Sequence, residues 1–284
     1  MLSKKFIPET FISEIDKKMK SNLHTHSTFC DGKSTCEEIV TAAISKGFTS
    51  IGFSGHAYTD FDLRYCMKDT EGYIKEIKSL KKKYKDDIEI YLGVEEDAHC
   101  PVKRSDFDYI IGSSHYYALN GEYYPIDSSP DHFKRCLEVY NYNVEKMAED
   151  YFGHFCDYIN ERKPDIVGHF DLITKFDEMG DSLFLKNEKY NRIAEKYIET
   201  VADSGCLFEV NTGAISRGYR RDPYPAENLL YILKKHNTPL VLASDSHSVE
   251  TLDFGFDEAK KMLKDIGFKH IFNLHSGHFV KEEL

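Results

Sequence analysis

The sequence of 284 residues lacks any apolar run as long as a membrane-spanning helix requires. Its first 18 residues, MLSKKFIPETFISEIDKK, also lack the apolar segment of a secretory signal. No linker rich in Gly, Pro or Ser and no low-complexity segment divides the chain. We therefore expect a cytoplasmic protein without a membrane partner, folded as a single domain over residues 1–284.

The cysteines lack the spacing of a zinc ribbon or a disulfide framework. They are odd in number, they stand singly and they form no CxxC pair. The seven residues are Cys30, Cys36, Cys66, Cys100, Cys136, Cys156 and Cys206. This scatter indicates reduced thiols, as in a cytoplasmic protein.

An excess of positive charge is also missing. The chain has 37 Lys and Arg residues against 48 Asp and Glu residues, which gives a formal net charge of −11. Such a charge is unfavourable for sequence-independent binding to the phosphates of a nucleic acid. We expect a small-molecule substrate and no nucleic-acid partner.

Short apolar runs alternate with helical patterns along the chain. The predicted strands are a short one ending at His24 and residues 49–54, 88–94, 107–112, 165–168, 206–210, 239–243 and 270–273. The predicted helices lie near 34–46, 70–85, 131–162, 186–204, 225–236 and 256–266. This alternation is typical of parallel βαβ units, and a barrel of seven or eight strands fits the length. A doubly wound open sheet is the alternative.

Histidines and acidic residues recur where the predicted strands end. His24 with His26, and Asp245 with His247, are spaced at i, i+2, and an extended backbone points such side chains to the same side. Asp31 lies in a turn close to the first pair. Single residues end four further runs: His56, Glu95, His115 and His169. Imidazole and carboxylate groups together suit a divalent metal such as Zn, Mn or Fe. Ligands from nearly every strand favour the barrel, in which they converge on one axis.

Glycines precede several of these positions, namely Gly55, Gly93, Gly112 and Gly168. We expect the missing side chains to leave room for the proposed ligands to crowd around metal ions. The other seven histidines lack this placement. Among them, His154 lies within a helical pattern and is expected to be packed or solvent-facing.

The chain resembles the polymerase-and-histidinol-phosphatase (PHP) superfamily, and within it the histidinol-phosphate phosphatases. The matching segments occur in the family's order over nearly the whole chain: LHTHSTFCDGK, IGFSGH, GVEED, IIGSSHYY, DIVGHFDLI, FEVNTGAISRGYRRDPYP and VLASDSH. The resemblance implies a distorted (β/α)7 TIM-like barrel with up to three divalent metal ions at the carboxyl ends of the strands. It also implies hydrolysis of L-histidinol phosphate to L-histidinol and inorganic phosphate in histidine biosynthesis.

The resemblance further implies three groups of metal ligands. The first metal would be held by His24, His26, Glu95 and Asp245. The second would be held by Glu95, as a bridging ligand, with His115 and His169. The third would be held by Asp31, His56 and His247. Some relatives carry His at the position of Asp31.

Basic residues that could hold a phosphate follow two of the strands. Arginine matches phosphate geometry bidentately, and the resemblance makes Arg217 the leading anchor. Arg220 and Arg221 are expected to be solvated loop residues. Lys175, on the loop that follows the DIVGH segment, is a second candidate for the same phosphate.

The departing alkoxide is a strong base, so a proton donor should assist the reaction. Asp245 and His247 are the candidates, in addition to their roles as metal ligands. The amine and imidazole of the substrate call for carboxylates or aromatic faces. Residues positioned for this, or for a purely structural role in the loops, are Glu96, Asp97, Tyr116 and Tyr117.

Three alternative functions remain open. The same site could hydrolyse a nucleotide or another small phosphate ester. An exonuclease of the polymerase-associated branch is disfavoured by the acidic charge and by the lack of basic segments. A metal-binding protein without catalysis is disfavoured by the complete ligand series.

Overall fold

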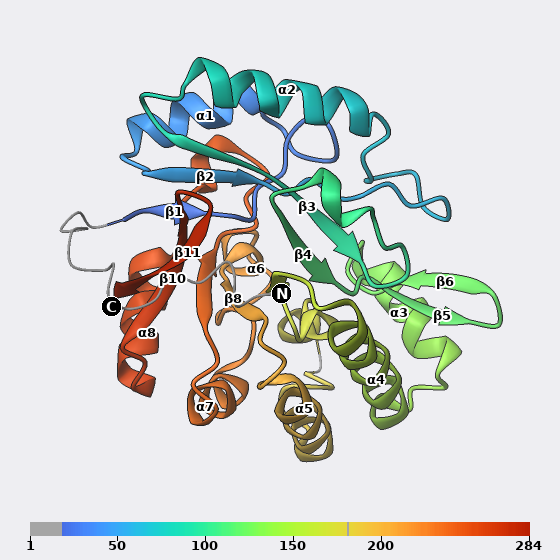
Figure 1. The fold of residues 1–284 in the computed structure, drawn as a ribbon. Coiled ribbons are helices and arrows are strands. Elements are labelled where there is room, and N and C mark those ends of the chain that lie inside the picture. Colours follow the sequence, from blue (N-terminus) through green and yellow to red (C-terminus); the bar gives the residue numbers. More distant parts are fainter. Residues whose placement is uncertain (1–18, 181) are drawn as a thin grey trace.

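Seven parallel strands form the central sheet, in the order β1-β2-β3-β4-β7-β8-β9 (Figure 1). The computed structural model describes residues 19–180 and 182–284, so the prediction about the first 18 residues lies outside the described residues. The strands are β1 Ser21–Asn22, β2 Ser50–Phe53, β3 Glu89–Asp97, β4 Tyr109–Ser113, β7 Ile166–Val167, β8 Leu207–Asn211 and β9 Leu240–Ala243.

The segments that follow the first and last strands close this sheet into a barrel. Thr25 and Ser246 form a parallel bridge between them. The backbone N–H of His26 donates to the carbonyl of Ser246 at 2.8 Å, and the N–H of Ser246 donates to the carbonyl of His24 at 3.1 Å. This closure confirms the predicted barrel and excludes the alternative of an open sheet.

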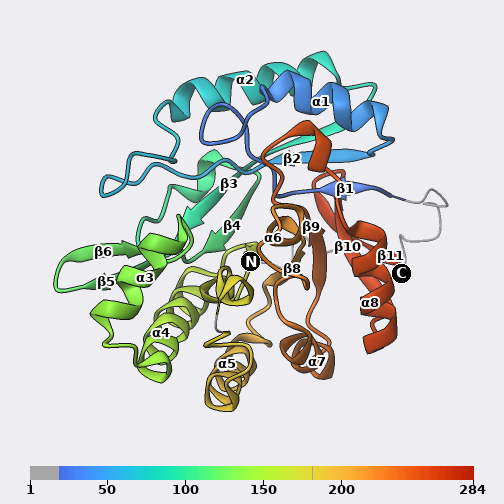
Figure 2. The same ribbon diagram turned by 180° about the vertical axis from the view of Figure 1, so that it is seen from behind.

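Helices surround the barrel in both views of the ribbon (Figures 1 and 2). The α-helices are α1 Cys36–Ser45, α2 Thr70–Lys83, α3 Pro130–Val139, α4 Val144–Arg162, α5 Glu188–Val201, α6 Gly213–Ser216, α7 Glu227–Lys235 and α8 Phe256–Ile266. Short 3₁₀ turns are η3 Arg104–Asp106, η4 Leu172–Thr174, η5 Asp177–Met179 and η6 Val249–Thr251. In α5, Tyr190, Ala194 and Ile198 are buried at the spacing of one helix face, which packs this helix on the core. No helix in the described ranges combines the length and apolarity that crossing a bilayer requires.

The single helix predicted over 131–162 is wrong, because the chain forms α3 and α4 there. Asn141 and Tyr142 separate them with φ values of 50° and 59°. Two successive left-handed residues cannot continue a right-handed helix. The break lets α4 start afresh, with the side chain of Asn143 accepting from the N–H of Lys146.

Two antiparallel hairpins lie outside the barrel sheet. The first, β5 Tyr116–Leu119 with β6 Glu122–Pro125, was not predicted, and it turns at Asn120-Gly121 with positive φ at both residues. Asn-Gly is the strongest short hairpin signal. The strand predicted at 270–273 exists as β10 His270–His275, but it pairs with β11 His278–Glu283 and not with the barrel.

The β10–β11 hairpin plugs the amino-terminal end of the barrel. Leu274 and Phe279 pack against the inward-facing residues of the strands, which are Leu23, Tyr91, Tyr109, Ile111, Ile166, Leu207 and Val241. The hydroxyl of Ser50, the first residue of β2, donates to the carbonyl of Leu274 at 3.0 Å. Only the carboxyl end is therefore left for the chemistry.

Candidate metal centre

All nine side chains predicted as metal ligands converge at the carboxyl ends of the strands. Each belongs to at least one group of three or more ligand atoms that lie within 4.8 Å of one another. The nine are His24, His26, Asp31, His56, Glu95, His115, His169, Asp245 and His247. They come from every barrel strand except β8.

The first group of ligand atoms surrounds one buried point. Nε2 of His24 and Nε2 of His26 lie 3.3 and 3.5 Å from Oε2 of Glu95. The same nitrogens lie 3.7 and 3.2 Å from Oδ1 of Asp245. Within the described residues, both nitrogens and the Glu95 oxygen are buried without a hydrogen-bond partner. Such atoms are costly unless something else binds them, and two imidazoles with two carboxylates fit a divalent metal.

The other oxygen of Glu95 faces a second pair of imidazoles. Its Oε1 lies 3.0 Å from Nε2 of His169 and 3.3 Å from Nε2 of His115. The hydroxyl of Ser113 also donates to this oxygen at 2.7 Å. The two oxygens of one carboxylate thus serve two neighbouring groups.

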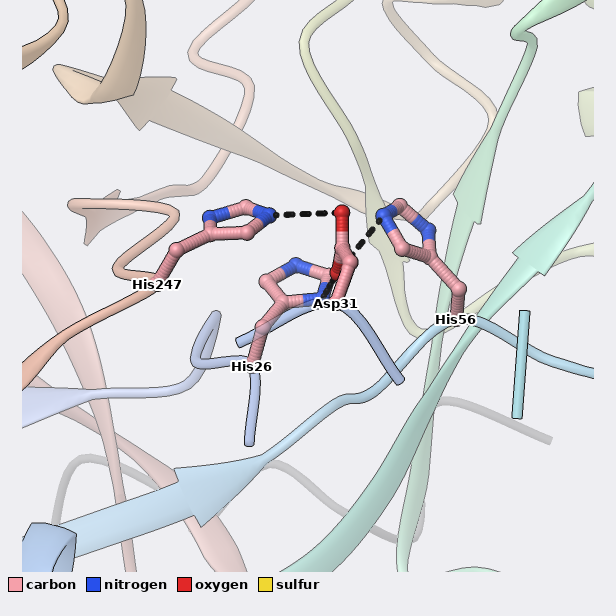
Figure 3. Close-up of side chains that lie close together, drawn as sticks. All are labelled: His26, Asp31, His56 and His247. Carbon is pink, nitrogen blue, oxygen red and sulfur yellow. Dashed lines mark ion pairs between the residues drawn. The ribbon is translucent and has the colours of Figure 1, made fainter. Parts of the chain in front are cut away.

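Asp31 is the centre of a third group (Figure 3). One of its oxygens lies 3.4 Å from Nε2 of His247, and the other lies 3.7 Å from both Nε2 of His56 and Nδ1 of His26. His56 connects this group to the rest, because its Nδ1 lies 2.8 Å from Oε2 of Glu95. The geometry brings Asp31 to the position that the resemblance implies.

Burial and the neighbouring charges shift the pKa values of Glu95 and His24 in opposite directions. Burial alone raises the pKa of Glu95, but His56, His24 and His115 hold that pKa well below its ordinary value. Burial alone lowers the pKa of His24, yet the carboxylates of Glu209, Glu95 and Asp245 raise it well above the usual range. The centre is therefore built around ionised carboxylates.

Two carboxylates hold imidazoles from behind: Glu209, which we did not predict, and Asp97, which we predicted only as a substrate-binding or structural loop residue. Nδ1 of His24 donates to Oε2 of Glu209 at 2.8 Å, and Nδ1 of His115 donates to Oδ2 of Asp97 at 3.1 Å. Carboxylates in this position fix the tautomer of a metal-binding histidine and raise its basicity. The signal for Glu209 was in the sequence, as a charged residue inside the buried strand CLFEV.

Asp245 departs from the extended backbone that its spacing with His247 predicts. Its φ is 47°, in the left-handed region. Asp245 consequently faces the first group of ligands while His247 faces Asp31. Gly213 makes room for this arrangement, because a Cβ there would lie 2.8 Å from the Cβ of Asp245 and 2.9 Å from a guanidinium nitrogen of Arg217.

The expectation that the other glycines make room for metal ligands is wrong for Gly93 and Gly112. A Cβ at Gly93 would lie 2.1 Å from the ring of Tyr109, and one at Gly112 would lie 2.6 Å from the ring of Tyr158. Both rings are buried, that of Tyr109 inside the barrel and that of Tyr158 on α4. These glycines therefore admit tyrosine rings.

A cavity of about 340 Å³ opens beside the proposed ligands. Both residues predicted to bind the phosphate, Arg217 and Lys175, line it. Arg217 donates to the carboxylate of Asp245 at 2.8 Å and to its carbonyl at 3.0 Å. Lys175 donates to the carbonyl of Asp127 at 2.8 Å and lies 3.1 Å from its carboxylate. Tyr116 also lines the cavity.

The expectation of a solvated loop is wrong for Arg220. Its side chain is 1% exposed and pairs with Asp171 at 3.3 Å, while it donates to the hydroxyl of Thr174 at 2.7 Å. Arg221 is exposed, as predicted, with 92% of its side chain accessible. Glu96 turns away from the site, because Arg162 holds it through two contacts of 2.7 Å.

Comparison with known proteins agrees with this geometry. A model of the PHP domain matches residues 22–213. The chain is 28% identical over 282 residues to a probable histidinol-phosphatase of Schizosaccharomyces pombe, covering 91% of this chain and 90% of that protein. It is 25% identical to the histidinol-phosphatase of Bacillus subtilis, covering 84% of this chain and 97% of that protein.

The fold also matches the crystal structure of histidinol phosphate phosphatase from Lactococcus lactis, complexed with zinc, L-histidinol and phosphate. The TM-score is 0.71 at 21% identity, covering 92% of this chain and 99% of that one. The family match spans more than half of the sequence and includes most of the converging ligands. The chain belongs to the PHP domain family.

Proposed function

We propose that this protein is a metal-dependent phosphomonoesterase that hydrolyses L-histidinol phosphate to L-histidinol and inorganic phosphate in histidine biosynthesis. The observation that carries the proposal is the position of Glu95. Its two oxygens face two groups of imidazoles at the edge of a cavity that also contains Arg217 and Lys175. The names of the relatives from S. pombe and B. subtilis support this substrate.

We assign the nine converging side chains to as many as three divalent ions, with zinc, manganese or iron as the candidates. When bound, such ions lower the pKa of coordinated water and stabilise negative charge on phosphoryl oxygens. The imidazoles bind through their ring nitrogens, of which Nε2 of His24 and Nε2 of His26 have no hydrogen-bond partner among the described residues. Glu209 and Asp97 keep two of those imidazoles in the correct orientation.

Arg217 and Lys175 bind the phosphate. A guanidinium group has five N–H donors, and Asp245 accepts from two of the nitrogens of Arg217, so further donors remain for phosphoryl oxygens. Burial alone lowers the pKa of Arg217, but Asp245 raises it, so the side chain keeps its charge. The ammonium group of Lys175 supplies a second positive charge to the same cavity.

We assign proton transfer to the leaving oxygen to Asp245 and His247. Nδ1 of His247 lies 2.9 Å from the carbonyl of Asp245, which leaves its Nε2 directed at Asp31. Both residues line the cavity, so a water molecule there could carry the proton.

The cavity also suits the organic part of the substrate. Tyr65, Tyr116 and Tyr219 supply aromatic faces for an imidazole ring, and Asp127 supplies a carboxylate near which an ammonium group can bind. The whole chain, residues 1–284, is proposed to act as one domain in the cytoplasm. Its seven cysteines are all free, in keeping with this location.

The test is the rate of phosphate release from three substrates by the metal-loaded protein. We expect L-histidinol phosphate to have a much larger kcat/KM than a nucleoside monophosphate or p-nitrophenyl phosphate. A preference for the nucleotide would retain the phosphatase site but refute the substrate. No release from any of the three would refute the enzyme.

A further inference from the structure

A second cavity, of about 490 Å³, lies between β5 and α4 and contains none of the nine proposed metal ligands. Tyr116 lines both this cavity and the catalytic cavity. Figures 1 and 2 show the β5–β6 hairpin beside α3 and α4. We call it the α4 cavity and define it by His99, Glu149, Gly153, His154, Asp157 and Tyr197.

Two stacked imidazoles form one wall of the α4 cavity. The rings of His99 and His154 lie 4.0 Å apart at an interplanar angle of 10°. Nε2 of His154 is buried and has no hydrogen-bond partner in the described part of the chain. Burial lowers the pKa of His154, and the neighbouring His99 lowers it further, so its ring is neutral at neutral pH. The neutral imidazole of His154 presents its face without repelling a cation.

Carboxylates from α4 line the same space. Glu149, Gly153 and Asp157 follow one another at i, i+4 spacing and so share a helix face. Glu149 accepts from the hydroxyl of Tyr197 at 2.7 Å and forms an ion pair with Lys196 at 3.6 Å. Asp157 is exposed and forms no hydrogen bond or ion pair with another described residue. The face therefore carries negative charge that is only partly balanced.

Gly153 stands between these carboxylates in the middle of a helix of 19 residues. Glycine in a helix interior costs about 1 kcal/mol relative to alanine. Packing does not require it, because a Cβ there would meet nothing closer than the hydroxyl of Tyr197 at 3.4 Å, an ordinary contact. A longer side chain at this position would occupy the cavity.

We propose that the α4 cavity binds a small aromatic amine, in which a flat ring carries a primary ammonium group. The ring packs against the imidazole and tyrosine faces, and the ammonium group is attracted to Glu149 and Asp157. This site is separate from the catalytic cavity and does not depend on the phosphatase activity.

Tyramine is a suitable probe, because it has a ring and an ammonium group and does not chelate metals. Its binding to the metal-loaded full-length protein is measured by calorimetry, with 4-hydroxyphenylacetate as the probe of similar shape and opposite charge. We expect tyramine to bind and the anion not to bind. Gly153→Met should abolish binding by filling the cavity, and Asp157→Asn should weaken it about two- to fivefold, as expected for the loss of one exposed ammonium–carboxylate contact.

Glu161→Gln is the matched control, because Glu161 is exposed on the same helix but does not line the cavity. Its binding of tyramine should equal that of the wild type. If Gly153→Met does not fold, Asp157→Asn still decides. Equal binding of both probes, or no binding of tyramine, would overturn the proposal. Tyramine binding that Asp157→Asn leaves unchanged would overturn it as well. Displacement of the tyramine by inorganic phosphate would likewise overturn it, because the binding would then occur in the catalytic cavity.

Discussion

Nδ1 of His24 lies 2.8 Å from Oε2 of Glu209, so this imidazole is held from behind while its Nε2 faces Glu95 and Asp245. The other oxygen of Glu209 accepts from the backbone N–H of His169 at 2.7 Å. One carboxylate on β8 thereby contacts residues of two ligand groups, although it belongs to neither group itself. We propose that Glu209 orients the imidazole of His24 and increases its basicity.

Glu209→Gln should weaken metal binding by roughly 10- to 100-fold, the usual cost of losing such a carboxylate. The amide keeps the shape of the side chain but loses the charge that polarises His24. Titration against a chromophoric chelator measures the change. Glu199→Gln, on the exposed face of α5, is the control and should bind metal like the wild type. Unchanged metal affinity in Glu209→Gln would show that Glu209 has only a structural role.

Arg217→Ala should reduce kcat/KM for L-histidinol phosphate by roughly 30- to 1000-fold, the range for losing a charge-assisted contact in the transition state. Metal content, measured by elemental analysis, should stay the same. Arg217→Lys should recover only part of the rate, because a single ammonium group cannot reproduce the bidentate contact. A wild-type rate in Arg217→Ala would contradict this role of Arg217 and make Lys175 the next candidate for the residue that binds the phosphate.

The convergence of the proposed metal ligands could be predicted from the sequence, because histidines and acids follow apolar runs and parallel strands bring their carboxyl ends together. The roles of Glu209 and Asp97 in orienting His24 and His115 could not be assigned, because these partners are distant from them in sequence. Arg220 was misjudged for the same reason: its loop gives no sign of the buried Asp171 that pairs with it. The break at Tyr142 was also hidden, since tyrosine rarely adopts a left-handed backbone.

Gly93→Ala should destabilise the fold by about 1–3 kcal/mol, because the new Cβ would lie 2.1 Å from the ring of Tyr109. That ring cannot easily move, since its hydroxyl donates to the carbonyl of Leu23 inside the barrel. Urea denaturation measures the loss. Gly153→Ala is the matched control and should be neutral or stabilising. Equal stability of the wild type and Gly93→Ala would contradict the packing described here.

Asp62 should make stability depend on pH in the acid range. Hydrogen bonds from Arg64, opposed by burial, lower the pKa of Asp62 to about 2, below its ordinary value of roughly 4. A lowered pKa contributes stability that is present above about pH 4 and is lost as the pH falls toward 2. The contribution should be on the order of 1 kcal/mol, since the half-exposed Arg64 is partly screened by solvent.

The measurement is urea denaturation of the wild type and Asp62→Asn at several pH values. The wild type should be the more stable at pH 5, and the difference should shrink at pH 3. A constant difference would mean that the stabilisation by Asp62 does not depend on its charge.

The central claim is that Glu95 joins two metal-binding groups into one catalytic centre. The most direct measurement is the number of metal ions per chain and the rate of phosphate release from L-histidinol phosphate, determined on the same samples of wild type and Glu95→Gln. We predict more than one ion per wild-type chain, activity that a strong chelator abolishes, and a joint loss of metal and activity in Glu95→Gln. A wild type that keeps full activity after chelation with no transition metal bound, or a Glu95→Gln variant that keeps both its metal and its rate, would contradict the account.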